Sequence, residues 1–327
     1  MSPSQPEVPV IDLAAFRRGG ADAAAVVAAV RDALERIGFL VVVGHGVDPA
    51  ITREAYAAAR DFFAQPDAAK LEVRIAPGGL PRGFLPYGTV ALAQTNAGPV
   101  AATPPDLKES FALGPEALGR NRWPNHAGAA GLRAAANRCF TAMETVMHAM
   151  LDLFAAALEL DPGYFRERFA GHDSTLRLFN YPALTQPPAP GQLRSGEHTD
   201  YGALTILSIG ADDPGGLQVR TRSGAWVDVS APPDSFVINI GDLLMMWSND
   251  RWLSNLHRVV VATDPADPDR AMRARQSMGF FANPRAEVLI ECLPGCADAD
   301  RPPRHPPILA GEHRLAKVRK SAPARVA

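Results

Sequence analysis

TLRLFNY, residues 175–181, is the first of a series of short, mostly apolar segments that follow one another as far as Cys292. The series continues with LRSGEHTD (193–200), ALTILSIG (203–210), GLQVRT (216–221), AWVDVS (225–230), SFVINI (235–240), LLMMWS (243–248), LHRVVVA (256–262), RQSMGFFA (275–282) and EVLIEC (287–292). Turns that contain Pro, Gly or Asp separate these segments. The spacing predicts an antiparallel β-sandwich or barrel.

The amino half of the chain has a different pattern. Residues 22–37 repeat apolar positions three and four apart and are followed by Gly38, which predicts a helix. FLVVV at 39–43 predicts a strand, and residues 49–64 and 130–160 return to helical spacing. The expected fold is therefore mainly β with flanking helices (α+β), in which a helical amino-terminal region packs on one barrel.

Residues 75–105 are rich in Gly, Pro, Ala and Thr and show neither the helical nor the strand period. This pattern predicts a long surface loop, and such loops in compact proteins often carry function.

Composition excludes several classes of protein. The 327 residues include 33 Lys and Arg against 35 Asp and Glu, a formal net charge of −2, which disfavours a nucleic-acid or membrane-surface partner. No apolar run is long enough to span a bilayer, and the first residues lack the features of a secretory signal. With only 3 cysteines, the chain is expected to be a reduced cytoplasmic protein.

The clearest chemical signal is His198-Thr199-Asp200 at the end of a predicted strand. Residues i and i+2 of a strand project to the same side, so one imidazole and one carboxylate can converge on a metal ion. A His-x-Asp triplet by itself is more often a surface turn. A later strand histidine, His257, would complete a two-histidine, one-carboxylate face, which is typical of non-haem Fe(II) oxygenases.

Arg275 and Ser277 form a second i, i+2 pair on a predicted strand. An arginine inside an apolar barrel is costly unless an anion meets it, so the pair predicts a buried carboxylate. The alternative is that Arg275 points outward and makes a surface ion pair.

These signals belong to a longer series of ordered motifs between about residues 8 and 290. In chain order the motifs are Pro9-Val10-Ile11-Asp12-Leu13, Gly38-Phe39, Gly44-His45-Gly46-Val47, Phe62-Phe63, Arg82-Gly83-Phe84, Lys108-Glu109-Ser110-Phe111, Asn180-Tyr181-Pro182, His198-Thr199-Asp200-Tyr201-Gly202, Asn239-Ile240-Gly241-Asp242, Ser248-Asn249, His257-Arg258-Val259, Arg275-x-Ser277 and Phe280-Phe281-x-x-Pro284. In this order the motifs resemble the isopenicillin N synthase-like family of Fe(II)- and 2-oxoglutarate-dependent oxygenases.

The resemblance implies a double-stranded β-helix, or jelly roll. It also implies a division of the chain into a non-haem dioxygenase amino-terminal region (1–120), supporting helices (121–170), the jelly-roll core (171–290) and a carboxyl-terminal tail (291–327).

The same resemblance implies roles for individual residues. His198, Asp200 and His257 would bind Fe(II), and Arg275, Ser277 and Tyr181 would bind the cosubstrate 2-oxoglutarate. No catalytic side chain is expected beyond the metal centre. O2 is the further cosubstrate, and ascorbate is an optional reductant. This chain departs from the pattern at Phe179, where many relatives carry Asn, and its tail matches the family only loosely.

The implied reaction couples O2 and the decarboxylation of 2-oxoglutarate, to succinate and CO2, to C–H oxidation of a small organic metabolite. Hydroxylation, desaturation and ring closure all remain open. The alternatives are an oxidase or cyclase that does not use 2-oxoglutarate, an ethylene-forming variant and, least favoured, a non-enzymatic jelly-roll binding module. The oligomeric state stays open, and a monomer and a weak dimer are both compatible with the sequence.

Arg82, Tyr87 and Phe281 are expected to line the substrate side. Arg82 or Lys108 could pair with a substrate carboxylate, but either could equally serve in a structural salt bridge. Other polar residues are expected to be structural. They are His45 in a turn, His148 in a helix, the loop cysteines Cys292 and Cys296, the scaffold residues Asn239, Gly241 and Asp242, and a solvated basic tail of Arg314, Lys317, Arg319, Lys320 and Arg325.

Overall fold

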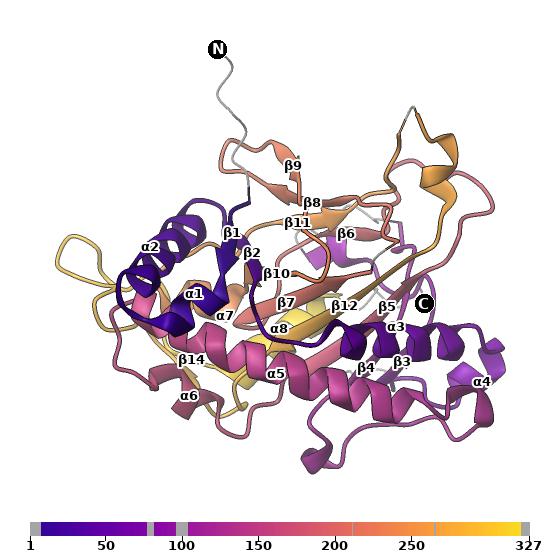
Figure 1. Cartoon of the computed structure of the whole chain (residues 1–327), viewed down its shortest axis with the longest axis horizontal. Coiled ribbons are helices and arrows are strands. Elements are labelled where there is room, and N and C mark those ends of the chain that lie inside the picture. The colour runs from indigo at the N-terminus through magenta and orange to yellow at the C-terminus, as the bar shows by residue number, and fades with distance from the viewer. Residues whose placement is uncertain (1–7, 77–81, 96–103, 211, 265, 322–327) are drawn as a thin grey trace.

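The computed structural model describes residues 8–76, 82–95, 104–210, 212–264 and 266–321 (Figure 1). Its larger sheet has eight strands in the order β1-β2-β10-β7-β12-β5-β4-β3, and its smaller sheet has four in the order β6-β11-β8-β9. The larger sheet consists of β1 (Val10–Asp12), β2 (Phe39–Val43), β3 (Gly83–Leu85), β4 (Glu109–Leu113), β5 (Thr175–Tyr181), β7 (Leu204–Ile209), β10 (Phe236–Ile240) and β12 (Arg275–Ala282). The smaller sheet consists of β6 (Ser195–His198), β8 (Leu217–Arg220), β9 (Trp226–Asp228) and β11 (His257–Val259).

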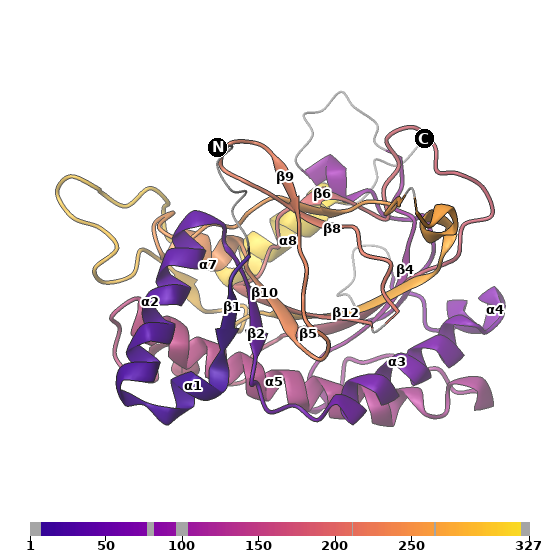
Figure 2. The ribbon, with the colours of Figure 1, turned by 45° about the horizontal axis from the view of Figure 1, so that its top comes forward.

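The two sheets face each other, as Figure 2 shows, and form a jelly roll. Pairing is antiparallel except for β1 with β2. One buried cluster joins residues of both sheets, including Val41 and Val237 from the larger and Val219 and Val259 from the smaller. The prediction of an antiparallel sandwich or barrel is therefore confirmed.

Strand alternation divides the larger sheet into two faces. On β12, Met278 and Phe280 point toward the helices and join the main apolar core, whereas Arg275 and Ser277 point into the barrel. The same period places Arg177 and Tyr181 of β5 on the inner face. The inner face can thus carry polar chemistry without interrupting the core beneath the sheet.

Helices cover the outer face of the larger sheet (Figure 2). α2 (Gly20–Arg36), α3 (Pro49–Phe63) and α5 (Leu132–Ala157) correspond closely to the predicted helices. Phe140 of α5 packs on Phe280 with ring centroids 5.0 Å apart. The remaining helices are α1 (Leu13–Arg18), α4 (Asp67–Leu71), α6 (Tyr164–Phe169), α7 (Asp242–Trp247), α8 (Ala310–Ser321) and the 3₁₀ turns η1 (Leu92–Thr95), η2 (Glu116–Leu118), η3 (Ala127–Ala129) and η4 (Pro268–Met272). None of the helices within the described ranges is both long and apolar enough to cross a bilayer.

Two predicted elements were wrong. LLMMWS, expected to be a strand, lies in helix α7, because Leu and Met are good helix formers and a run this short shows no period. The region 75–105, expected to be one long surface loop, contains β3 and η1, while residues 77–81 and 96–103 lie outside the described part. EVLIEC contributes only β13 (Leu289–Ile290), which pairs with β14 (Ile308–Leu309) in a separate sheet.

The basic tail also differs from the prediction, because α8 is docked on the barrel rather than solvated. Lys317 lies 2.7 Å and His313 3.6 Å from Oδ2 of the buried Asp242. Arg314 reaches Asp173 at 3.1 Å. Arg319 and Lys320 are exposed, as expected, and Arg325 lies outside the described residues.

Candidate metal centre

The three predicted metal ligands come together where β6 and β11 meet. His257 is the direct cross-strand partner of His198, and Asp200 follows β6 by two residues. Oδ1 of Asp200 lies 3.8 Å from Nε2 of each histidine. All three ligand atoms lie within 4.8 Å of one another, so one metal ion can contact all of them.

Each imidazole is oriented by a backbone carbonyl. Nδ1 of His198 lies 2.7 Å from the carbonyl oxygen of Gly196, and Nδ1 of His257 lies 3.1 Å from that of Asn255. Because a carbonyl only accepts, both Nδ1 atoms carry the proton and both Nε2 lone pairs are free to bind a metal.

Asp200 is held by its other oxygen. Thr205 donates to Oδ2 at 2.5 Å and Asn239 donates to it at 2.7 Å, which leaves Oδ1 toward the two histidines. Asn239 was predicted to be scaffold only, and Thr205 was not singled out. Asn239 on β10 and Thr205 on β7 are cross-strand partners. The sequence of either strand alone does not predict this pairing.

Electrostatics favour the metal-binding protonation state. Burial, together with the adjacent His257, lowers the pKa of His198 to about 3. Burial works to raise the pKa of Asp200, but the two histidines and the two donors outweigh burial and lower it. Two imidazoles and one carboxylate, all mostly buried, are the donor set that suits Fe(II).

Arg275 and Ser277 point into the same interior. Arg275 is 2% exposed, and its Nη1 donates to Oγ of Ser277 at 3.2 Å. On its other edge, Nε donates to Oδ1 of Asp213 at 3.1 Å and Nη2 lies 2.9 Å from Oδ2. Asp213 is thus a protein carboxylate against Arg275, which the sequence did not disclose. Nη1 and Ser277 form the remaining donor edge.

Tyr181 stands across from Arg275 in the sheet register. It is buried, and its ring centre lies 4.9 Å from the guanidinium carbon of Arg275. Tyr181, Arg275 and Ser277 therefore share one surface. Lys108 is also buried there, with Oγ of Ser195 at 2.6 Å, Asp106 at 3.0 Å and the ring of Phe179 at 5.7 Å.

The three predicted substrate residues differ in their surroundings. Arg82 is buried and donates to Asp173 at 2.6 Å and to Thr175 at 2.7 Å, which favours its structural alternative. Tyr87 is 44% exposed, and its substrate role stays a prediction. The ring of Phe281 lies against that of Phe179, with centroids 6.4 Å apart, on the inner face.

Glu144, His148 and His172 form another group with metal-binding side chains. Nδ1 of His172 accepts from the backbone N–H of Ser174 at 3.3 Å, so its proton is on Nε2, which lies 2.7 Å from Glu144. This donor arrangement is that of a hydrogen-bonded pair. His45 is likewise outside the metal centre and contacts the carbonyl oxygen of Asp234 at 2.7 Å.

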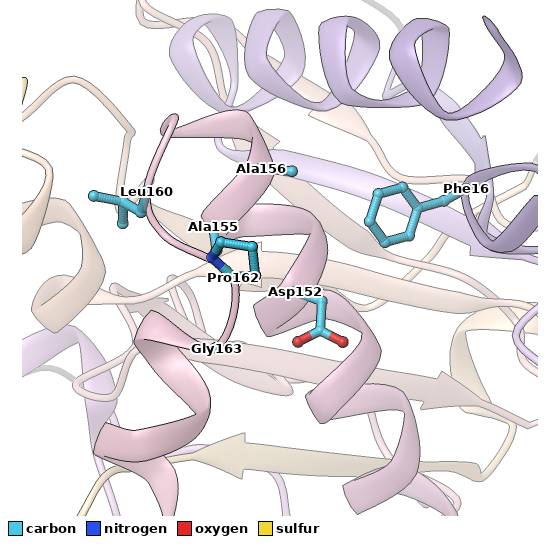
Figure 3. A pocket seen from close by; sticks show the side chains of 7 residues that line it. All are labelled: Phe16, Asp152, Ala155, Ala156, Leu160, Pro162 and Gly163. Atoms are coloured by element: carbon cyan, nitrogen blue, oxygen red, sulfur yellow. The ribbon is translucent and has the colours of Figure 1, made fainter. Parts of the chain in front are cut away.

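A cavity of about 240 Å³ lies on the helical side of the molecule, lined by residues of α1 and α5 and by the segment after α5 (Figure 3). Its lining is apolar apart from Asp152, which is paired with Arg166. Since it offers no second metal-binding or acid–base group, it is not the candidate site.

Two family models match the chain. Residues 8–126 match the model described as non-haem dioxygenase in morphine synthesis N-terminal. Residues 172–284 match the model of the 2OG-Fe(II) oxygenase superfamily, and this span contains all three candidate metal ligands.

Comparison with individual proteins points to the same superfamily as the family models. The chain is 30% identical to the 2-oxoglutarate-Fe(II) type oxidoreductase hxnY of Emericella nidulans over 94% of this chain and 88% of that protein. It is 34% identical to gibberellin 20 oxidase 3 of Oryza sativa subsp. japonica, over 91% of this chain and 78% of the oxidase. A full-length Neurospora crassa protein, crystallised in complex with alpha-KG and thymine, superposes with a TM-score of 0.83, at 30% identity over 95% of this chain and 97% of that one.

Proposed function

Because the chain belongs to the 2-oxoglutarate- and Fe(II)-dependent oxygenase superfamily, we propose that His198, Asp200 and His257 hold its iron and that the enzyme oxidises a C–H bond of a small organic molecule. The convergence of these three side chains carries the proposal. We also propose residues 1–120 as the amino-terminal region, 121–170 as supporting helices, 171–290 as the catalytic core and 291–327 as the carboxyl-terminal segment.

When bound, the iron and 2-oxoglutarate supply the activation of O2, with release of succinate and CO2. For hydroxylation the balance is substrate C–H plus O2 plus 2-oxoglutarate, giving substrate C–OH, succinate and CO2. The chain orients the metal ligands through the carbonyls of Gly196 and Asn255 and through Asn239 and Thr205. We propose that Arg275, Ser277 and Tyr181, which contact one another on the inner face, bind the distal carboxylate of 2-oxoglutarate.

A small substrate is favoured by the enclosed position of the site between two sheets and by the near-neutral charge of the chain. The Neurospora crassa protein, whose fold this chain shares, has been crystallised with thymine, which is a molecule of this size.

A metabolite screen tests the proposal. Purified protein with Fe(II), ascorbate and 2-oxoglutarate is expected to consume O2 and form succinate when its substrate is added. O2 uptake without succinate would indicate the oxidase alternative, and ethylene in the headspace would indicate the ethylene-forming variant. Failure of the apoprotein to bind Fe(II) under argon would contradict the proposal outright.

A further inference from the structure

Among the described residues, the cations of the interior have partners, with one exception. Lys70, Arg82, Lys108 and Arg275 each meet a carboxylate at 3.0 Å or less. A further buried arginine, Arg194, donates to backbone carbonyls at 2.5 to 3.5 Å. This is the usual rule, because an unpaired charge away from water is costly.

Arg177 is the exception. The residue is half-buried with its Nε atom enclosed, and the guanidinium makes no hydrogen bond or ion pair with any residue in the described ranges. Burial lowers the pKa of Arg177, and the neighbouring Tyr201 and Asp200 only partly offset that effect. An arginine in this state lacks the anion that its position requires.

The position of Arg177 directs it into the barrel beside the metal ligands. It lies on β5 between Leu176 and Leu178, which face the helical core, so its own side chain projects inward. Its cross-strand neighbours are the small residues Ala112 and Gly279, so the side chains nearest to it on the inner face include the phenyl rings of Phe179 and Phe281. Its charge is within electrostatic range of Asp200.

Other arginines add positive charge at this end of β5. Asp173 is shared by Arg82 at 2.6 Å, Arg314 at 3.1 Å and Arg120 at 3.8 Å. Arg82 is in turn within electrostatic range of Arg177. The carboxylate of Asp173 is therefore shared by three arginines, whereas Arg177 forms no ion pair with a described carboxylate.

From this unmatched charge we propose that Arg177 binds a carboxylate of the primary substrate, whose apolar body lies against Phe179 and Phe281. This inference rests on the proposed function and names the substrate class as small, apolar organic acids. The Phe179 ring lies 6.0 Å from the guanidinium carbon, and both phenyl rings lean over Gly279. A carboxylate and a guanidinium form a charge-assisted, bidentate pair that an amide cannot reproduce.

2-Oxoglutarate is not the missing partner. Arg177 lies four residues along β5 from Tyr181, about 13 Å at 3.3 Å per residue. The carboxylate held at Arg275 therefore cannot also reach Arg177, and the carboxylate at the other end of the diacid is the one that the metal would bind. Arg177 thus faces the side of the metal centre that is left for the primary substrate.

The test compares acids with their uncharged amides. Benzoate, phenylacetate and 3-phenylpropionate and the three corresponding primary amides are added under argon to the full-length protein, with and without Fe(II) and 2-oxoglutarate. Thermal-shift assays and isothermal titration calorimetry measure the affinity for each compound. At least one acid is expected to bind the wild type about tenfold more tightly than its amide. Arg177→Met should abolish this preference, and Arg177→Lys should retain part of it.

The controls separate this inference from the proposed function. Fe(II) and 2-oxoglutarate affinities should be the same in Arg177→Met as in the wild type, and Arg53→Met, at an exposed position on α3, should keep the acid preference. If the wild type binds neither iron nor 2-oxoglutarate, the proposed function fails. If no acid is preferred over its amide, or if Arg177→Met keeps the preference, the role of Arg177 is overturned.

Unfolding of the apoprotein gives a second, independent result. Arg177→Met should be at least as stable as the wild type, because the substitution removes an unpaired charge from the barrel interior. A clear loss of stability would show that Arg177 has a structural partner, and the inference would then be wrong.

Discussion

The two ends of the barrel interior differ in chemistry although the same strands build both. On β10, Asn239 points inward and holds Asp200, whereas Val237, two residues earlier on the same face, packs in the apolar cluster with Phe39 and Val219. At the polar end, partners fix the position of each ligand. At the apolar end, only close packing is needed. We therefore expect substitutions at the polar end to affect ligand binding and those at the apolar end to affect stability.

Asp200→Ala should have the largest effect. The substitution removes one of three metal ligands and little core volume, so iron binding and turnover should fall below detection while the fold remains. Succinate formation, iron titration and the melting temperature measure the three quantities. Asp228→Ala, at an exposed position on β9, is the matched control and should behave like the wild type. Near-normal iron affinity in Asp200→Ala would exclude this centre.

Arg275→Leu should have the next largest effect. Loss of the guanidinium group should raise the KM for 2-oxoglutarate by about 100-fold. Truncating one partner of a buried charge pair typically costs about 2–5 kcal/mol of binding free energy. Iron affinity should stay within about twofold of the wild type, because Arg275 does not contact the metal ligands. Asp213→Asn, which keeps the shape of the arginine's partner, should raise the same KM less. An unchanged KM in Arg275→Leu would place the cosubstrate elsewhere.

Asn239→Ala sharpens the comparison within one strand. It removes one of the two donors to Oδ2 of Asp200, while Thr205 remains. Loss of a hydrogen bond that orients a metal ligand typically costs about 10–100-fold in metal affinity, so we expect about a tenfold weaker affinity for iron. Thr205→Val, which removes the other donor at nearly constant volume, should have a similar effect. If both variants bind iron normally, these hydrogen bonds do not position the ligand.

Those elements and residues that follow from the local pattern of the sequence could be predicted from it. Periodicity predicts α2, α3 and α5, and spacing together with family resemblance predicts His198, Asp200 and His257. Ion pairs and hydrogen bonds between residues far apart in the sequence could not be predicted, because no local pattern indicates which distant residues will meet. Asp213 meets Arg275 from 62 residues away.

The same limit applies to two arginines. Arg82 was a candidate for the substrate, but a partner 91 residues away occupies it. Arg177 was not singled out, because its significance lies in the lack of a partner among the described residues. That property becomes visible only when the neighbours of the side chain are known.

Val237→Ala should have the smallest effect on activity and tests the apolar end. Val237 is fully buried, so losing two methyl groups should lower the free energy of unfolding by about 2 kcal/mol. The affinities for iron and 2-oxoglutarate should not change at a temperature where the variant is folded, because Val237 packs in the apolar cluster with Val41 and Val219. Denaturant unfolding and iron titration measure the two outcomes. A weaker iron affinity together with the lower stability would mean that the two ends of the barrel are mechanically coupled, and the separation of roles argued from β10 would be wrong.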